Sequence, residues 1–178
     1  MTRMIQKITT PRLIVRRVAF DDWKAIQSVW SDRAVSSFAQ YDKPVDLADS
    51  AVCVRIAKWA SFSDSLEHMF FAVCLEARVI GYISFNQRSE GYEIGYCFHS
   101  AYHGNGYALE SVSHALNELK ALGVPRVTAG TALDNRPSVR LLQKLGFQLI
   151  GTESVSFYND SNGDPVYFQG GIFELRLL

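Results

Sequence analysis

Glu93-Ile94-Gly95-Tyr96-Cys97-Phe98-His99 and, just after it, His103-Gly104-Asn105-Gly106-Tyr107-Ala108 decide the fold of this chain. The first stretch predicts a strand whose odd-numbered and even-numbered side chains lie on opposite faces. The glycines of the second stretch allow backbone angles, or a close approach by a ligand, that a side chain would block. The residues that follow predict a helix, with an apolar stripe made of Ala108, Val112, Ala115, Leu119 and Leu122.

A strand, a glycine turn and a helix in this order favour a phosphate site. The first amides of a helix point outward, and the helix dipole adds about half a positive charge there. A P-loop needs a lysine followed by serine or threonine after its last glycine, and Tyr107-Ala108 supplies neither. A dinucleotide fold needs a third glycine where this chain has Leu109. By itself, the turn is equally compatible with a tight connection that binds nothing.

A second motif, Asn135-Arg136-Pro137-Ser138, follows the predicted strand Arg126–Thr131 and opens another helix. Two parallel strands that are each followed by a helix bring both helix starts to one edge of the sheet, where ligands collect in open α/β sheets. The amide of Asn135 and the hydroxyl of Ser138 are therefore candidates for binding a long ligand. Simple capping of the helix is the alternative.

The remaining segments predict a mixed α/β domain with one parallel step, covering residues 1–178 without a linker or internal repeat. One helix is expected to begin near Trp23 and a second near Asp46, each with a buried stripe that includes tryptophan. The segment between them, Ser31 to Pro44, is expected to be irregular and to border a cleft. The expected further strands are Leu13–Val15, Met69–Leu75, Val79–Phe85, Val155–Tyr158 and a closing strand that ends at Leu178.

Composition narrows the possible functions. Lysine and arginine together number 18, as do aspartate and glutamate, so the formal net charge is zero and a nucleic-acid partner is not expected. No apolar stretch approaches the roughly 20 residues that span a bilayer, so no membrane partner is expected. The three cysteines lie in apolar runs, which favours a reducing, cytoplasmic location. His99 and His103 have no cysteine or carboxylate at metal-ligand spacing, so no metal is expected.

Together, the motifs resemble the GNAT acetyltransferase superfamily. Tyr92 to Ala108 resembles its acetyl-coenzyme A motif, Q/R-x-x-G-x-G/A, with His103 where glutamine or arginine is usual. Asn135 to Phe147 resembles the following motif, N-x-x-S-x-x-x-x-x-K-x-G-F, and Thr10 to Arg16 resembles the start of the RimJ/RimL branch, which acetylates the N-termini of ribosomal proteins. The resemblance implies the GNAT fold: a central mixed, mostly antiparallel sheet with helices on both faces.

The resemblance also implies a cofactor site for acetyl-coenzyme A, with coenzyme A as the product. Backbone groups of Phe98 and His99 would pair with the pantetheine arm, and Asn135 would contact the same arm. An amide at a bulge in this strand would polarise the acetyl carbonyl. The pyrophosphate would bind the turn made of His103, Gly104, Asn105, Gly106, Tyr107 and Ala108.

For acid and base, the candidates are Glu93 and Ser138. Glu93 is the expected base, acting through water on the acceptor amine, unless it is an ordinary charged strand residue with a cross-strand partner. Many relatives use a tyrosine as the acid, but this chain has Leu142 at that position. Ser138 is the expected substitute, as in the RimL type, unless it only caps the helix. Tyr102 and Tyr158 are the remaining hydroxyl donors.

The expected acceptor is a primary amine, most simply the α-amine of a ribosomal or other protein N-terminus. Four aspartates in or beside the predicted rim are candidates for attracting a cationic amine: Asp32, Asp42, Asp46 and Asp49. A polyamine or aminoglycoside is the alternative acceptor, and a coenzyme A-binding sensor without turnover is the alternative function. Both a monomer and a homodimer are compatible with the sequence.

Overall fold

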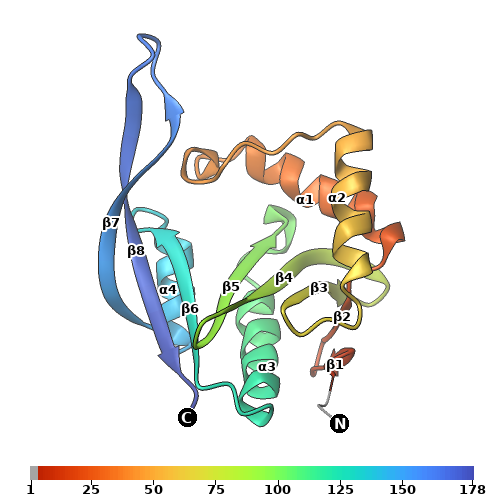
Figure 1. Cartoon of the computed structure of the whole chain (residues 1–178). Helices are drawn as coiled ribbons and strands as arrows, with labels where there is room; N and C mark the ends of the chain where they lie inside the picture. Colours follow the sequence, from red (N-terminus) through yellow and green to blue (C-terminus); the bar gives the residue numbers. More distant parts are fainter. Residues whose placement is uncertain (1–3) are drawn as a thin grey trace.

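An eight-stranded sheet forms the centre of the computed structural model, which describes residues 4–178 (Figure 1). Its strand order is β1-β2-β3-β4-β5-β6-β8-β7, and β5 and β6 are its parallel pair. All other neighbouring strands run antiparallel. The strands are β1 Lys7–Thr9, β2 Leu13–Arg17, β3 His68–Leu75, β4 Arg78–Arg88, β5 Gly91–Phe98, β6 Arg126–Ala132, β7 Gln148–Asn159 and β8 Pro165–Arg176.

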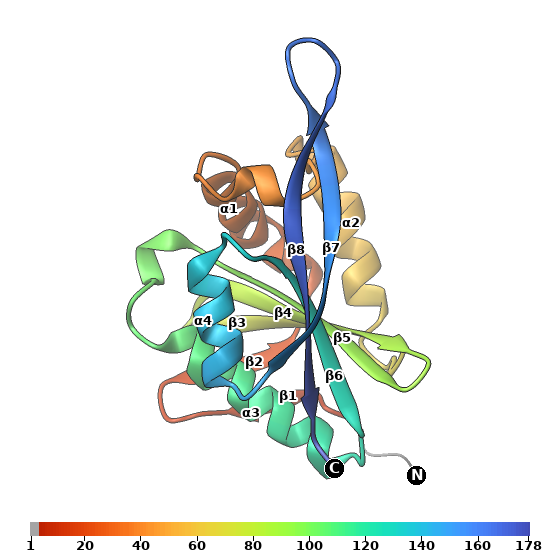
Figure 2. The same ribbon diagram turned by 90° about the vertical axis from the view of Figure 1, so that its left-hand side faces the viewer.

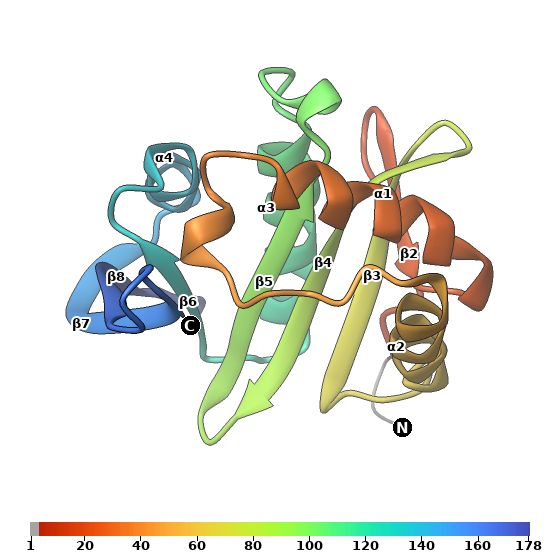
Figure 3. The same ribbon diagram turned by 90° about the horizontal axis from the view of Figure 1, so that it is seen from above.

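Four α-helices cover the two faces of this sheet, as Figure 3 shows from above. Helices α1 and α2 pack on one face over a cluster that contains Ile26, Trp30, Val52 and Ile56. Helix α3 packs on the other face, and α4 joins it there through the buried Leu142. The helices are α1 Trp23–Ala34, α2 Asp49–Ser61, α3 Tyr107–Ala121 and α4 Arg136–Lys144, with short 3-10 turns η1 Phe20–Asp22, η2 Ala39–Tyr41 and η3 Ser100–Tyr102. Within residues 4–178, no helix is long and apolar enough to cross a bilayer.

The parallel pair β5–β6 is unusually short. It consists of the pairs Tyr92–Val127 and Glu93–Thr128, although β5 continues to Phe98 and β6 to Ala132. Beyond these pairs the two strands separate, and α3 and α4 begin near the separated ends (Figure 3). The backbone groups of β5 that point away from β4 beyond Glu93 therefore lie outside the β5–β6 ladder.

The mixed, mostly antiparallel sheet with helices on both faces confirms the predicted architecture. Several boundaries were predicted wrongly, and three of them border the predicted rim or the glycine turn. Helix α1 continues to Ala34, so the irregular segment is shorter than the predicted Ser31–Pro44. Helix α2 begins at Asp49, because Asp46 lies before the helix and accepts a hydrogen bond from the Ala48 amide at 2.9 Å. Strand β5 ends at Phe98, and His99 is the N-cap of the short turn η3.

The closing hairpin is longer than the sequence predicts. Strand β7 runs from Gln148 to Asn159, whereas the sequence predicted only Val155–Tyr158. Most β7 residues are exposed, because β7 is an edge strand and pairs on one side only, with β8. It therefore lacks the apolar alternation by which sequence analysis finds half-buried strands. Figure 2 shows that the tip of this hairpin projects beyond the rest of the molecule.

Packing around Leu142 gives a stability prediction. Leu142 is 0% exposed and joins α4 to the core, whereas Leu149 on β7 is 49% exposed. Leu142→Ala is expected to lower the free energy of unfolding by about 2–5 kcal/mol, because it leaves a cavity. The matched variant Leu149→Ala is expected to change it by less than about 0.5 kcal/mol. Urea unfolding followed by circular dichroism measures both, and equal losses would contradict this account of the core.

Candidate functional site

The glycine turn between β5 and α3 has the backbone that its sequence predicts. Gly104 has φ of 78° and Gly106 has φ of 79°, in the left-handed region that side chains rarely adopt. A Cβ placed on Gly104 would have no protein atom within 4 Å, and one on Gly106 would meet only the Arg12 Nη2, at 3.5 Å. The protein therefore needs these glycines for their backbone angles, and it leaves open space on the outer side of the turn.

Side chains of the turn hold its shape. His103 Nε2 donates a hydrogen bond to the Phe98 carbonyl at 2.8 Å, which ties the turn back to the end of β5. Asn105 Nδ2 donates to the carbonyls of Tyr102 at 3.3 Å and His103 at 3.1 Å. His103, the residue that departs from the family motif, thus acts on the backbone of the turn.

Helix α3 begins without a side-chain cap. Gly106 occupies the N-cap position and has no oxygen to offer, and the first helical hydrogen bond runs from the Glu110 amide to the Gly106 carbonyl at 3.0 Å. The amides of residues 107–109 precede this bond and point out of the helix start. An anion satisfies such donors, and Asp, Asn or Ser at the cap would have done so within the chain. The donor set at this turn fits a phosphate group.

An arginine from the other end of the sequence lies beside the same turn. The Arg12 guanidinium is 4.6 Å from the centre of the Tyr107 ring, and its Nε donates to Glu110 Oε2 at 2.7 Å. Glu110 also accepts from Thr10 Oγ1 at 2.6 Å and from the Arg12 amide at 2.8 Å. Burial opposes ionisation of Glu110, but these hydrogen bonds outweigh it and lower the pKa of its carboxyl group. Ionised Glu110 therefore fixes Arg12 at the start of α3.

The sequence analysis did not single out Arg12 or Glu110 as site residues. Arg12 lies in the Thr10–Arg16 motif and Glu110 in the first turn of the predicted helix, so each was visible locally. Their pairing joins residues 98 positions apart. No periodicity or spacing in a single sequence reports a contact of that range.

The end of β5 differs from the expectation in one respect. The pairing of β5 with β4 is regular from Gly91 to Phe98, so the bulge that the resemblance implied in this strand is not present. The His99 amide donates to the Ile80 carbonyl at 3.0 Å, on the β4 side. Because strand residues alternate their hydrogen-bonding direction, the backbone of Tyr96 and the amide of Phe98 face away from β4. Separation from β6, in place of a bulge, leaves this edge open.

The start of α4 meets β5 through two hydroxyl groups. Asn135 Oδ1 accepts from the Ser138 amide at 3.4 Å, so Asn135 caps the helix. The Ser138 hydroxyl is turned to β5, where its Oγ is 2.8 Å from the Tyr96 Oη. Burial raises the pKa of Tyr96, and its hydrogen bond with Ser138 offsets part of the rise. Tyr96 was predicted only as an even-numbered strand residue, and it proves to be the partner of Ser138.

Glu93 lies where the β5–β6 ladder ends, on the face opposite to Tyr96. Its Oε2 accepts from Arg88 Nε at 2.9 Å and lies 2.7 Å from Arg88 Nη2. Both side chains are about half exposed, at 47% for Glu93 and 53% for Arg88. The cross-strand partner considered in the sequence analysis is therefore present, and the carboxylate remains accessible to solvent.

The cysteine next to Tyr96 has the character of a buried thiol. Burial raises the pKa of Cys97 to about 11, and the nearby Arg33 offsets only part of this effect. At neutral pH the group is therefore a neutral thiol, which is a poor nucleophile.

The four rim aspartates all have partners within the chain. Asp32 accepts from both the amide and the hydroxyl of Ser100, at 2.8 and 2.6 Å. Asp42 accepts from Arg33 Nε at 2.6 Å, and Asp49 accepts from Gln27 Nε2 at 2.7 Å. Together with the bond from the Ala48 amide to Asp46, these contacts leave no aspartate of the rim unpaired.

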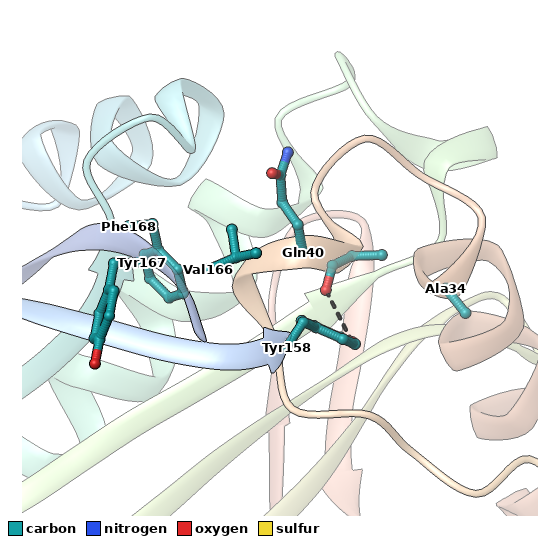
Figure 4. A pocket seen from close by; sticks show the side chains of 7 residues that line it. Ala34, Gln40, Tyr158, Val166, Tyr167 and Phe168 are labelled. Atoms are coloured by element: carbon teal, nitrogen blue, oxygen red, sulfur yellow. Dashed lines mark hydrogen bonds between the residues drawn. The ribbon is translucent and has the colours of Figure 1, made fainter. Parts of the chain in front are cut away.

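A pocket of about 350 Å³ lies between η2 and the closing hairpin (Figure 4). Tyr158 Oη donates to the Ala39 carbonyl at 3.3 Å across it, and the rings of Tyr41 and Phe168 meet edge to face with centres 5.2 Å apart. The pocket is lined by Ala34, Ala39, Gln40, Tyr158, Val166, Tyr167 and Phe168. Tyr158, a reserve acid in the sequence analysis, is thus part of a pocket wall.

Comparisons with known proteins match most of the chain. A family model described as an acetyltransferase (GNAT) domain matches residues 12–148. The uncharacterized N-acetyltransferase YnaD of Bacillus subtilis (strain 168) is 28% identical over 145 residues, which cover 81% of this chain and 84% of YnaD.

Two solved structures share the fold over nearly the whole chain. RimL, a ribosomal L7/L12 α-N-protein acetyltransferase in complex with coenzyme A, has a TM-score of 0.81 at 16% identity, covering 96% of this chain and 98% of its own. The ribosomal-protein-S5-alanine acetyltransferase of Vibrio fischeri has a TM-score of 0.79 at 19% identity, covering 97% of each chain.

Proposed function

Because the chain belongs to the GNAT acetyltransferase family and is an acetyl-coenzyme A-dependent N-acetyltransferase, we propose that its acceptor is the α-amine of a protein or peptide N-terminus. The opening Thr10–Arg16 motif supports this branch, as do the names of two neighbours of similar fold. RimL is described as an α-N-protein acetyltransferase, and the Vibrio fischeri protein as acting on an alanine of ribosomal protein S5.

The observation that carries the cofactor site is the uncapped start of α3 beside Arg12. Three outward amides, two glycines with positive φ and a fixed guanidinium suit a pyrophosphate. The open edge of β5 at Tyr96 and Phe98 suits the amides of a pantetheine arm. Acetyl-coenzyme A supplies an activated acetyl thioester, and these residues hold it in line with the acceptor.

Glu93 is the proposed base. Its exposed carboxylate accepts the proton of the acceptor amine through a water molecule. Both Arg88 contacts are made with Oε2, so Oε1 is the oxygen proposed to accept the proton. An ordinary ion pair between neighbouring strands has the same geometry, and the effect of Glu93→Gln on kcat separates the two roles.

Ser138 is the proposed acid, with Tyr96 behind it. Ser138 Oγ holds a proton at the start of α4, and the Tyr96 Oη, 2.8 Å away, replenishes it. Burial raises the pKa of Tyr96, so its hydroxyl stays protonated at neutral pH. This pair takes the place of the tyrosine that many relatives have where this chain has the fully buried Leu142.

A panel of acceptors tests the proposed function. Thioester consumption is expected with unblocked peptides, and blocking the α-amine by formylation is expected to abolish it. The ε-amine of an internal lysine in the same peptides serves as the control and is expected to react at least 10-fold more slowly. Turnover with spermine or an aminoglycoside but with no peptide would contradict the peptide acceptor. Tight coenzyme A binding without turnover of any amine would favour a sensor.

The pyrophosphate site can be tested at Gly104. Gly104→Ala is expected to weaken coenzyme A binding by at least 10-fold, because a methyl group would occupy the open side of the turn. Gly163→Ala in the closing hairpin is the matched control, since Gly163 has φ of 87° and likewise no atom within 4 Å of an added Cβ. Both variants carry the same backbone strain. Isothermal titration calorimetry measures the affinities, and equal losses would remove the site from this turn.

The proton-transfer residues can be tested by steady-state kinetics of single variants. Ser138→Ala is expected to lower kcat by about 10²-fold, and Tyr96→Phe by a smaller factor, with little effect on KM. The double variant is expected to lose less than the product of the single losses, because the two hydroxyls share one hydrogen bond. Glu93→Gln is expected to lower kcat by about 10²-fold, while Glu90→Gln in the adjacent turn leaves it nearly unchanged. Unchanged rates would return these residues to structural roles.

A further inference from the structure

The pocket between η2 and the closing hairpin has a chemistry that neither the family nor its relatives specify. We propose that this pocket binds an aromatic or bulky apolar side chain next to the amine of the acceptor, so that the enzyme selects acceptors whose first residue is of this kind. The proposal rests on the proposed function, because it assigns the substrate class of the same reaction. Figure 4 shows the side chains of Val166 and Phe168 on β8, with Gln40 near Val166, and Tyr167 between them in sequence pointing the other way.

No lining residue of the pocket carries a charge. Four of the seven are apolar in all side-chain atoms: Ala34, Ala39, Val166 and Phe168. Two others have donors that are already engaged, since Tyr158 Oη donates to the Ala39 carbonyl and Gln40 Nε2 donates to the Ser37 carbonyl at 2.9 Å. A ligand gains little from hydrogen bonding in such a pocket, and it gains free energy by burying apolar surface.

The surrounding charges argue against a polycation. A polyamine or aminoglycoside needs several carboxylates that are free to pair with its ammonium groups. No aspartate of the rim lines the pocket; Asp42 forms an ion pair with Arg33, and Asp32 already accepts two hydrogen bonds from Ser100. Lys43 Nζ lies 5.9 Å from the centre of the Phe157 ring, which in turn contacts the ring of Phe168 in the pocket. Because the seven lining residues are uncharged, the pocket favours an uncharged side chain.

Three of the apolar and aromatic side chains that line the pocket are unusually exposed to solvent. Tyr167 is 64% exposed, Val166 49% and Tyr158 38%, and all three lie in the pocket. Single exposed apolar side chains are ordinary, but a concave cluster of them is typical of a binding surface. At about 350 Å³ the pocket lies near the lower limit for ligand sites, which are typically about 300–1,000 Å³. This volume suits one side chain.

A hydrogen bond connects the pocket wall to the loop that precedes Ser138, the proposed acid. Phe168 in its wall is followed by Gln169, whose carbonyl accepts from the Leu133 amide at 2.9 Å. Leu133 begins the short loop that leads to Asn135, the cap of the helix that presents Ser138. Strand β8, which forms the wall, is thus hydrogen-bonded to the loop that positions Ser138. An acceptor side chain in the pocket therefore contacts a strand that is hydrogen-bonded to the loop before α4, the helix that carries Ser138.

Peptide series test the proposal. The acceptors are peptides that begin with phenylalanine, leucine, alanine or serine and are otherwise identical, together with phenylalaninamide and spermine. For the unaltered enzyme, kcat/KM is expected to be about 10- to 100-fold higher for the phenylalanine and leucine peptides than for the alanine and serine peptides. Equal values across the four peptides, or a preference for spermine, would overturn the proposal.

Substitution of the wall localises the effect. Val166→Asp is expected to lower kcat/KM for the phenylalanine peptide by about 10-fold and to change it less than about 2-fold for the alanine peptide. Val54→Asp is the matched control, because Val54 is an exposed valine on α2 outside the pocket, and it is expected to leave both values unchanged. Equal losses on both peptides in Val166→Asp would also overturn the proposal.

The small amine separates this inference from the proposed function. If phenylalaninamide reacts and no peptide does, the peptide acceptor is wrong but the apolar pocket stands, provided that Val166→Asp impairs this reaction. If the alanine and phenylalanine peptides react equally well, the peptide acceptor stands and the pocket assignment fails. If no acceptor turns over, calorimetry with the phenylalanine peptide and coenzyme A decides, and an absence of binding overturns the proposal.

Discussion

The short ladder between β5 and β6 is the constraint on which the rest of the molecule depends. Two parallel pairs join the strands at Tyr92 and Glu93, and the strands then separate. Because β5 keeps regular pairing with β4 to Phe98, it stays rigid on one side while its other edge is open. Unpaired backbone groups of β5, the glycine turn and the start of α4 all lie beside this open edge. A full parallel ladder would fill that edge with hydrogen bonds between strands.

The starts of α3 and α4, which lie beside the open edge of β5, are capped differently, and the difference indicates their roles. At α4, Asn135 caps the Ser138 amide, so the helix start is satisfied from within the chain and the Ser138 hydroxyl is free to meet Tyr96. At α3, Gly106 offers no cap, and the outward amides remain available to an anion. Glu110 completes this arrangement by fixing Arg12 beside the turn, which adds a cation without filling the open side.

The pocket proposed for the acceptor side chain is built by elements from distant parts of the chain. The segment after α1 supplies Ala39 and Gln40, and β8 supplies Val166 to Phe168. The rim aspartates that the sequence suggested as attractors of a cation are used instead to hold the rim together, as in the pairing of Asp42 with Arg33. The lining of the pocket itself is aromatic and apolar apart from Gln40. The electrostatics of the rim are thus decided by pairing, and a count of acidic residues does not predict them.

The sequence by itself determined the strand from Glu93, the glycine turn and the apolar stripe of α3, because alternation, positive φ and helical periodicity act over a few residues. It also determined the cap at Asn135 and the family. The tertiary structure alone decided that Tyr96 meets Ser138, that Arg12 pairs with Glu110 and that η2 faces β8. These contacts join residues 42 to 127 positions apart, and strand order fixes them. The length of β7 was decided in the same way, since its partner β8 defines it and no buried face of its own does.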